Sequence, residues 1–139
     1  MSSLKNTDES VYQPKQEWSY KARSGEEGSS LVICKVETHS EMGTIVHVTV
    51  RGLNIKNPLQ KTGFSDVITH LPFTEAAIDN SVVKVLSKNH KLPEDLQEDF
   101  QLAYADWAAA FEQGKANILN STVAETIDYI ESSINSTGE

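Results

Sequence analysis

The sequence predicts an α+β fold, in which an antiparallel meander of three to four strands is covered by three helices packed on one face. The first observation is that apolar residues, many of them β-branched, alternate with polar ones between residues 17 and 71. The second is that apolar residues recur with helical spacing from residue 74 onward. Strands first and helices second along the chain favour α+β over a parallel α/β arrangement.

The densest apolar run, residues 31–51, is predicted to form the central hairpin of the sheet. Alternation gives both of its strands one apolar face, formed by Val32, Cys34, Val36, Val46, Val48 and Val50. Gly43 suits the turn, where a positive φ is common. We expect Thr38 to pair with Thr44, which sets three further pairs: Val36 with Val46, Cys34 with Val48, and Val32 with Val50.

Further strands are expected before and after the hairpin. A first strand over residues 18–23 is indicated by the alternation of Trp18, Tyr20 and Ala22 with polar residues. Pairing of Ala22 with Val32 would place Trp18 beside Val36. A strand over residues 64–71 has no cleanly apolar side, so we expect it at a sheet edge. A short strand is also possible near residues 117–120.

Three helices are predicted over about residues 74–88, 94–113 and 122–134. Thr74 is a suitable N-cap for the first helix, and Gly114 should end the second. Thr122 followed by Glu125 matches a capping box at the start of the third helix. All three apolar stripes are expected to pack on the valine face, which would leave the other face of the sheet to solvent or to the N-terminal tail.

Length and composition indicate one domain over residues 17–135 of the 139, with residues 1–16 as a polar tail or arm and 136–139 as a frayed end. A single cysteine excludes an internal disulfide and favours a reducing compartment. No stretch reads as a signal peptide or a membrane span, so we expect a cytoplasmic protein without membrane contact.

The negative charge is concentrated in the C-terminal third of the chain. The net charge is −8 overall, yet residues 94–139 contain ten acidic residues and one basic residue. Such a surface repels nucleic acid and attracts basic proteins, although it also serves solubility. The residues predicted to dock a basic partner protein are Glu94, Glu98, Asp99, Asp106, Glu125, Asp128 and Glu131.

The opposite face of the predicted sheet has basic residues and is the alternative site. It would bring together Lys21, Arg23, Lys35, His47 and Arg51, and could bind a small molecule or support weak enzyme activity. Simple solvation of this face is the other interpretation. A homo-oligomer could also form through its apolar residues, Leu31, Ile33 and Ile45.

No catalytic, cofactor or metal motif stands out. Cys34 is expected to be an inert buried thiol, because its alternation places it on the core face. The histidines lack the spacing of zinc ligands. Asp66 and His70 are about 13 Å apart along one strand, too far for a hydrogen bond. A site assembled across strands from His47, Asp66 and His70 is left open, and no catalytic residue is assigned.

No run of residues matches the motif of a named family. The overall profile, acidic and without a catalytic motif, is similar to that of small bacterial immunity proteins, which inhibit basic toxins. The sequence therefore favours a non-enzymatic protein-binding domain, of immunity type, that docks a basic partner. The alternative is a small-molecule-binding protein or weak enzyme with a pocket on the outer sheet face.

Overall fold

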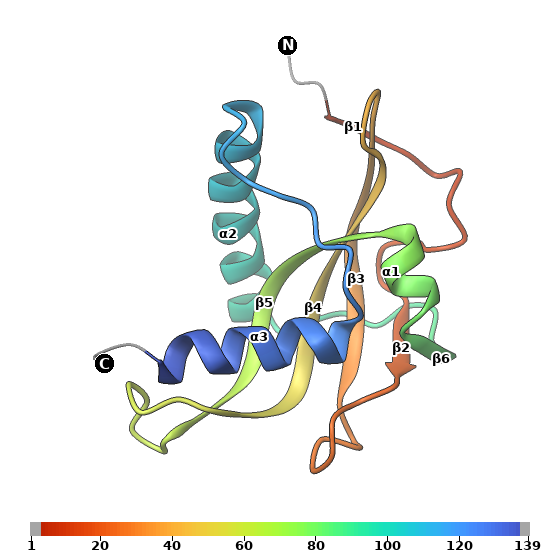
Figure 1. The fold of residues 1–139 in the computed structure, drawn as a ribbon. Helices are drawn as coiled ribbons and strands as arrows, with labels where there is room; N and C mark the ends of the chain where they lie inside the picture. Colours follow the sequence, from red (N-terminus) through yellow and green to blue (C-terminus); the bar gives the residue numbers. More distant parts are fainter. Residues whose placement is uncertain (1–3, 137–139) are drawn as a thin grey trace.

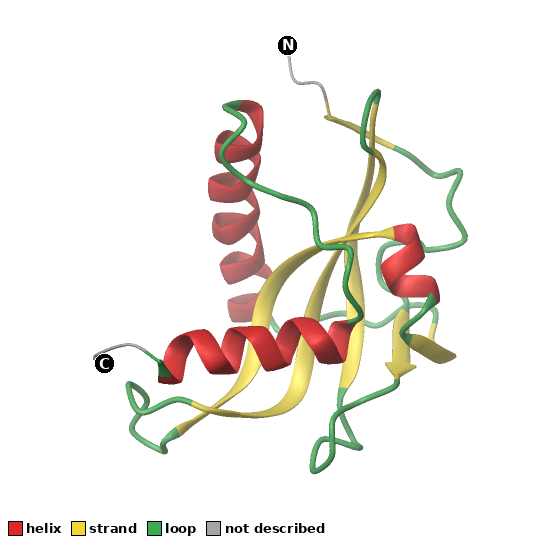
Figure 2. Cartoon of the chain, in the orientation of Figure 1, coloured by secondary structure: helices red, strands yellow, loops and turns green. Residues whose placement is uncertain are grey.

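The computed structural model describes residues 4–136, in which an antiparallel sheet lies between helices on both of its faces (Figures 1 and 2). Its elements are β1 (Leu4–Asn6), β2 (Glu17–Tyr20), β3 (Ser30–His39), β4 (Gly43–Lys56), β5 (Phe64–Thr74), α1 (Glu75–Asp79), β6 (Val82–Ser87), α2 (Glu94–Glu112) and α3 (Val123–Asn135). The strand order is β5-β4-β3-β2-β6, and β1 pairs with β3. The α+β class is confirmed, with six strands in the described residues rather than three or four.

The β3–β4 hairpin is the centre of the sheet, and its turn has the predicted register. Thr38 pairs with Thr44, and Val36 with Val46. Gly43 has a φ of 79°, a value that costs glycine little and other residues more. The predicted edge position of the strand that begins at Phe64 is also correct, because β5 is the last strand on its side of the sheet.

Beyond the turn, an irregularity at Cys34 changes the register of the hairpin. The two residue steps from Ile33 to Lys35 on β3 lie opposite the single step from Val48 to His47 on β4, so Cys34 is an extra residue in a β-bulge. The predicted pairing of Cys34 with Val48 and of Val32 with Val50 is therefore wrong. The observed pairs are Leu31 with Val50, Val32 with Thr49, and Ile33 with Val48.

The bulge also changes which residues of β3 enter the main core. Leu31 and Ile33 join it, whereas Cys34 does not. The homo-oligomer surface predicted from Leu31, Ile33 and Ile45 is absent as an exposed patch, because all three side chains are 0% exposed. The buried core cluster is formed by Tyr12, Tyr20, Leu31, Ile33, Val36, Val46, Val48, Val50, Leu53, Ile55, Leu71, Phe73, Ala77, Ile78, Val123 and Ile127.

The first predicted helix is mostly wrong, because only its beginning is helical. Thr74 caps α1 as expected, accepting a hydrogen bond from the backbone N–H of Ala77. After one short helix the chain becomes β6, which pairs with β2. The β-branched residues of β6, Val82, Val83 and Val85, favour an extended strand. The edge of β2 provides the strand with which they pair.

The register predicted for the first strand is also wrong. Trp18 pairs with Leu31 rather than lying beside Val36, and Ala22 lies outside the strand, which ends at Tyr20. Tyr20 still reaches the core, with Trp18 and Ala22 packed against it. The end of β3 nearest the β3–β4 turn instead contacts the N-terminal arm, residues 4–16. The arm pairs with β3 through β1, and the N–H of Thr7 donates to the Val36 carbonyl at 3.1 Å.

The helices do not pack on one face of the sheet, contrary to the prediction. Residues of α1 and α3 belong to the valine core, whereas α2 packs on the other face against β5 and β4 (Figure 1). His47 alternates with Val46 and Val48 along β4, so its side chain points to the opposite face of the sheet. There it contacts Tyr104 and Trp107 of α2. The aromatic stripe of α2 thus covers the face that was expected to be solvated.

The remaining C-terminal predictions agree closely with the structure. Helix α2 ends at Glu112, with Gln113 as its C-cap just before Gly114 (φ 72°), and α3 begins with the capping box of Thr122 and Glu125. The segment near residues 117–120 contributes one parallel bridge, between Leu119 and Phe73, rather than a strand.

A cluster of ion pairs centred on Arg23 connects α3 to the sheet. Arg23 donates to Glu26 at 2.7 Å, to Asp128 at 3.0 Å and to Glu131 at 3.0 Å. Glu26 is buried and also accepts a hydrogen bond from the backbone N–H of Asn54 at 2.6 Å. Arg23 therefore connects the β2–β3 loop, β4 and α3 through one guanidinium group.

We predict that Arg23→Gln lowers the free energy of unfolding by about 2 kcal/mol, because it leaves the buried Glu26 carboxylate without its cation. Urea unfolding at neutral pH measures the change. Lys21→Gln is the matched control, since Lys21 is exposed and two residues away. An equal loss of stability in both variants would contradict the role assigned to Arg23.

Candidate functional site

A buried polar network lies between α2 and the sheet. His47 Nε2 is 2.8 Å from Glu37 Oε1, and His47 Nδ1 is 2.9 Å from His70 Nε2. Tyr104, on α2, donates its hydroxyl to Glu37 Oε2 at 2.7 Å. The side chain of His47 is fully buried. Strands β3, β4 and β5 and helix α2 each contribute one member to this chain of hydrogen bonds.

Hydrogen bonds and burial together determine the protonation of the network. Burial raises the pKa of the Glu37 carboxyl, but hydrogen bonds from His47 and Tyr104 outweigh it and the net pKa is lowered. Glu37 is thus an acceptor, so His47 Nε2 donates to it. Burial lowers the pKa of His47 despite Glu37, and lowers that of His70 to about 4. With His47 neutral, its Nδ1 accepts from the Nε2–H of His70.

The sequence named two members of this network and missed the other two. His47 and His70 come together, as the open hypothesis allowed, whereas Asp66 is exposed and takes no part. Glu37 is one residue from the core residue Val36, and alternation placed it on this face. Tyr104 could not be anticipated, because α2 was expected on the other face.

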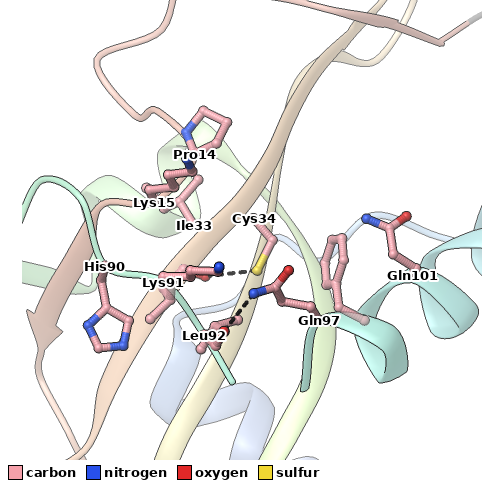
Figure 3. Close-up of a pocket in the computed structure, with 11 residues that line it drawn as sticks. Pro14, Lys15, Ile33, Cys34, His90, Lys91, Leu92, Gln97 and Gln101 are labelled. Atoms are coloured by element: carbon pink, nitrogen blue, oxygen red, sulfur yellow. Dashed lines mark hydrogen bonds between the residues drawn. The ribbon is translucent and has the colours of Figure 1, made fainter. Parts of the chain in front are cut away.

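A cavity of about 360 Å³ opens beside this network, between β3 and the start of α2 (Figure 3). Its buried floor includes Val32, Leu92 and Phe100. Figure 3 shows Gln97 and Gln101 on the α2 side of Cys34, and Lys15, His90 and Lys91 on the other. The complete lining is Pro14, Lys15, Val32, Ile33, Cys34, His90, Lys91, Leu92, Gln97, Phe100 and Gln101.

Two backbone irregularities shape the cavity. Cys34 points there because of the bulge in β3. Lys15 has a φ of 78°, and within residues 4–136 no other residue except glycine has a positive φ. Its N–H donates to the Ile33 carbonyl at 2.8 Å, and its carbonyl accepts from His90 N–H at 2.7 Å. Bulges and left-handed non-glycine residues often occur at binding sites.

Cys34 lines the cavity rather than the main core, but its thiol is a poor nucleophile. Burial raises its pKa, although a hydrogen bond with Thr49 Oγ1 at 3.3 Å acts in the opposite direction. The thiol therefore stays protonated at neutral pH, and the reactive thiolate is scarce. This chemistry suits a wall of a binding site better than a catalytic group.

A second polar cluster adjoins the cavity at His90. Arg51 lies 2.8 Å from His90 Nε2 and 3.6 Å from Glu17, whose other oxygen is 3.5 Å from His90 Nδ1. Ser30 donates to Glu17 at 2.6 Å. The Nε atom of Arg51 is buried and has no hydrogen-bond partner among the described residues. The imidazole ring of His90 is thereby held between the guanidinium of Arg51 and the carboxylate of Glu17.

The five basic residues of the predicted alternative site do not form one site. Lys35 lies over the ring of Tyr104, with Nζ 5.1 Å from the ring centroid, and His47 is in the buried network. Arg51 belongs to the His90 cluster, Arg23 pairs with α3, and Lys21 is exposed. The basic residues that do line the cavity, Lys15 and Lys91, were not identified from the sequence, since both lie in irregular segments.

The acidic residues are likewise divided, because α2 and α3 cover different faces of the sheet. On α3, Asp128 and Glu131 pair with Arg23, and Glu125 belongs to the capping box. The acidic residues of α2 that are exposed and form no ion pair with any described residue are Glu94, Asp95, Glu98, Asp99 and Asp106. The predicted acidic residues therefore lie on two separate surfaces, one on α2 and one on α3.

Comparisons of the chain with protein-family models, with curated proteins and with solved structures found no match. Among residues 4–136, no helix has the length and apolarity needed to cross a membrane. The same residues contain no group of three or more His, Cys, Asp or Glu side chains that could hold a metal ion.

We predict that the stability of the protein falls as pH decreases from about 6.5 to about 4, because the unfolded chain binds a proton at His70 that the folded chain does not. Between pH 7 and pH 5 this amounts to about 1–2 kcal/mol, allowing for solvent screening at the partly exposed ring. Urea unfolding at the two pH values tests this.

His70→Gln keeps a donor for His47 and should remove part of this pH dependence. His39→Gln, at the β3–β4 turn and outside the network, is the control and should retain it. Unchanged pH dependence in His70→Gln would show that the network does not cause it.

Proposed function

We propose that this protein binds a small molecule in the cavity between β3 and α2. The observation that carries the proposal is that the cavity is built from backbone irregularities, the bulge at Cys34 and the left-handed Lys15, rather than left between poorly packed elements. Its volume of about 360 Å³ lies within the range of ligand pockets, roughly 300–1,000 Å³.

The lining supports binding rather than covalent chemistry. Buried apolar groups form the floor, and amides and amines stand at the rim, as in many ligand sites. The nearest nucleophile, Cys34, has a raised pKa. The neighbouring histidines, His47 and His70, are neutral and held by hydrogen bonds within the network. Ligand binding is therefore the function that we favour over catalysis.

Ligand binding is tested with a panel of small aromatic and aliphatic acids, amides and amines, observed by ¹H–¹⁵N correlation spectra. We expect members of the panel to shift the backbone amide signals of Val32, Cys34, Leu92 and Phe100. Cys34→Met should abolish these shifts by filling the cavity with a flexible apolar side chain. Cys34→Ser keeps the volume and should retain them.

Thermal unfolding of both variants confirms that they remain folded. Shifts in Cys34→Met equal to those of the wild type, or a panel that leaves these four signals unmoved in the wild type, would reject the cavity as a ligand site.

A second candidate function, docking of a basic partner protein, is favoured by the exposed side of α2. Leu102 is 68% exposed, and its helical neighbours are acidic: Asp95, Glu98, Asp99 and Asp106 at i−7, i−4, i−3 and i+4. An apolar centre with a charged border resembles a protein interface more than a merely solvated helix. An inhibitor of immunity type, as inferred from the overall profile, would use such a surface against a basic toxin.

A photo-crosslinking residue at Leu102 tests this docking in cells. We expect crosslinks to a basic protein that disappear when Glu98, Asp99 and Asp106 are changed to Lys, and that weaken as salt increases in cell extracts. Tyr129 of α3 is the control site, since it is 74% exposed on the other side of the sheet. Equal crosslinking from both sites, or crosslinks that survive charge reversal, would count against docking through α2.

A further inference from the structure

The floor of the cavity is apolar and buried. Val32 and Leu92 are buried, and Phe100 is fixed by ring contacts with Tyr104 and His70 at centroid distances of 6.1 and 5.5 Å. A ligand that rests on this floor must leave water, which is favourable only for an apolar body. The floor therefore selects molecules with an aliphatic or aromatic part.

The charged side chains of the lining are basic without exception. They are Lys15 and Lys91, with His90 as a further titratable group. The chain as a whole has 20 acidic and 12 basic residues, so a lining without a carboxylate runs against the overall composition. Neither lysine forms an ion pair with any residue in the described part of the chain. Two lysines without an ion pair thus border an apolar floor.

The backbone holds the two lysine segments together. The hydrogen bond from His90 N–H to the Lys15 carbonyl joins the residue before Lys91 to Lys15 itself. Figure 3 shows both segments on the same side of the cavity, facing α2. The two lysine segments therefore border the cavity from the same side.

The conformation of Lys15 is an independent indication that its side chain is required. Lys15 has a left-handed conformation, which is unfavourable for a non-glycine residue and which glycine adopts freely. Glycine would satisfy both backbone hydrogen bonds of residue 15 at lower cost, because they use only main-chain atoms. A lysine at this position is explained if its side chain acts at the rim.

The acidic groups near the cavity do not neutralise this rim. Glu17 is already engaged by Arg51, His90 and Ser30. The carboxylates in the first turns of α2 are exposed and absent from the lining, where α2 contributes Gln97, Phe100 and Gln101. The side-chain amide of Gln97 donates to the Leu92 carbonyl at 2.6 Å, which fixes this wall.

We propose that the ligand of this cavity is a small molecule with an apolar body and a carboxylate head group. The body lies on Val32, Leu92 and Phe100, and the carboxylate lies between the ammonium groups of Lys15 and Lys91. This assignment rests on the ligand-binding function proposed for the cavity and adds the chemical class of the ligand. A charge-assisted contact of this kind gives orientation as well as affinity.

The test compares matched ligands that differ only in the head group. 4-Phenylbutyrate, its amide and 4-phenylbutylamine form one series, and octanoate, octanamide and octylamine form the other. Dissociation constants come from chemical-shift titrations of the full chain. We expect each carboxylate to bind about tenfold more tightly than its amide, and each amine to bind most weakly.

Two charge-matched double variants identify the residues responsible. Lys15→Gln with Lys91→Gln should remove the preference for the carboxylate. Lys61→Gln with Lys84→Gln removes the same charge from exposed positions outside the lining and should preserve the preference. Both variants change surface side chains, and circular dichroism verifies their fold.

Each remaining outcome is decisive. Amides that bind as tightly as the carboxylates would overturn the carboxylate assignment and leave the ligand-binding function intact. A preference that survives the Lys15 and Lys91 substitutions would also overturn it. If no member of either series binds, both the assignment and the ligand-binding function fail.

Discussion

The β-bulge at Cys34 is the constraint on which the rest of the structure depends. One extra residue in β3 reverses the alternation on one side of it, so Leu31 and Ile33 pack in the core while Val32 and Cys34 face α2. The same strand therefore supplies the apolar core at one end and a cavity wall in its middle. Without the bulge, the alternation of β3 would place Cys34 in the core and Ile33 on the face that α2 covers.

Helix α2 gives this second face its properties. Its inner side carries Phe100, Tyr104 and Trp107, which cover a sheet face that contains Glu37 and two histidines. A buried carboxylate is tolerated because both of its oxygens accept hydrogen bonds. Its outer side is acidic and lacks any basic residue. One helix thus separates a cavity with basic residues at its rim from a negatively charged surface.

This separation of charge links the two proposed functions to different sides of the same element. A basic protein approaching the outer side of α2 would meet Leu102 between carboxylates, whereas a small carboxylate would meet Lys15 and Lys91 across the sheet-facing cavity. Electrostatic attraction acts in opposite senses at the two places, so neither ligand competes for the other's site. The cavity carries the stronger argument, because its geometry is built by the backbone itself.

The sequence by itself determined the α+β class, the hairpin turn with its Thr38–Thr44 pair, the edge position of β5, and helices α2 and α3 with the Thr122–Glu125 cap. These follow from local periodicity and capping, which short-range sequence carries. Only the tertiary structure decided the bulge, the formation of a strand by residues 82–87 and the face on which α2 packs. Each of these depends on contacts with residues distant in the sequence. Strand β6 needs the edge of β2 as a partner, and His47 and Glu37 need the aromatic side of α2. The cavity was hidden for the same reason, since Lys15, Cys34 and Phe100 meet only after those choices are made.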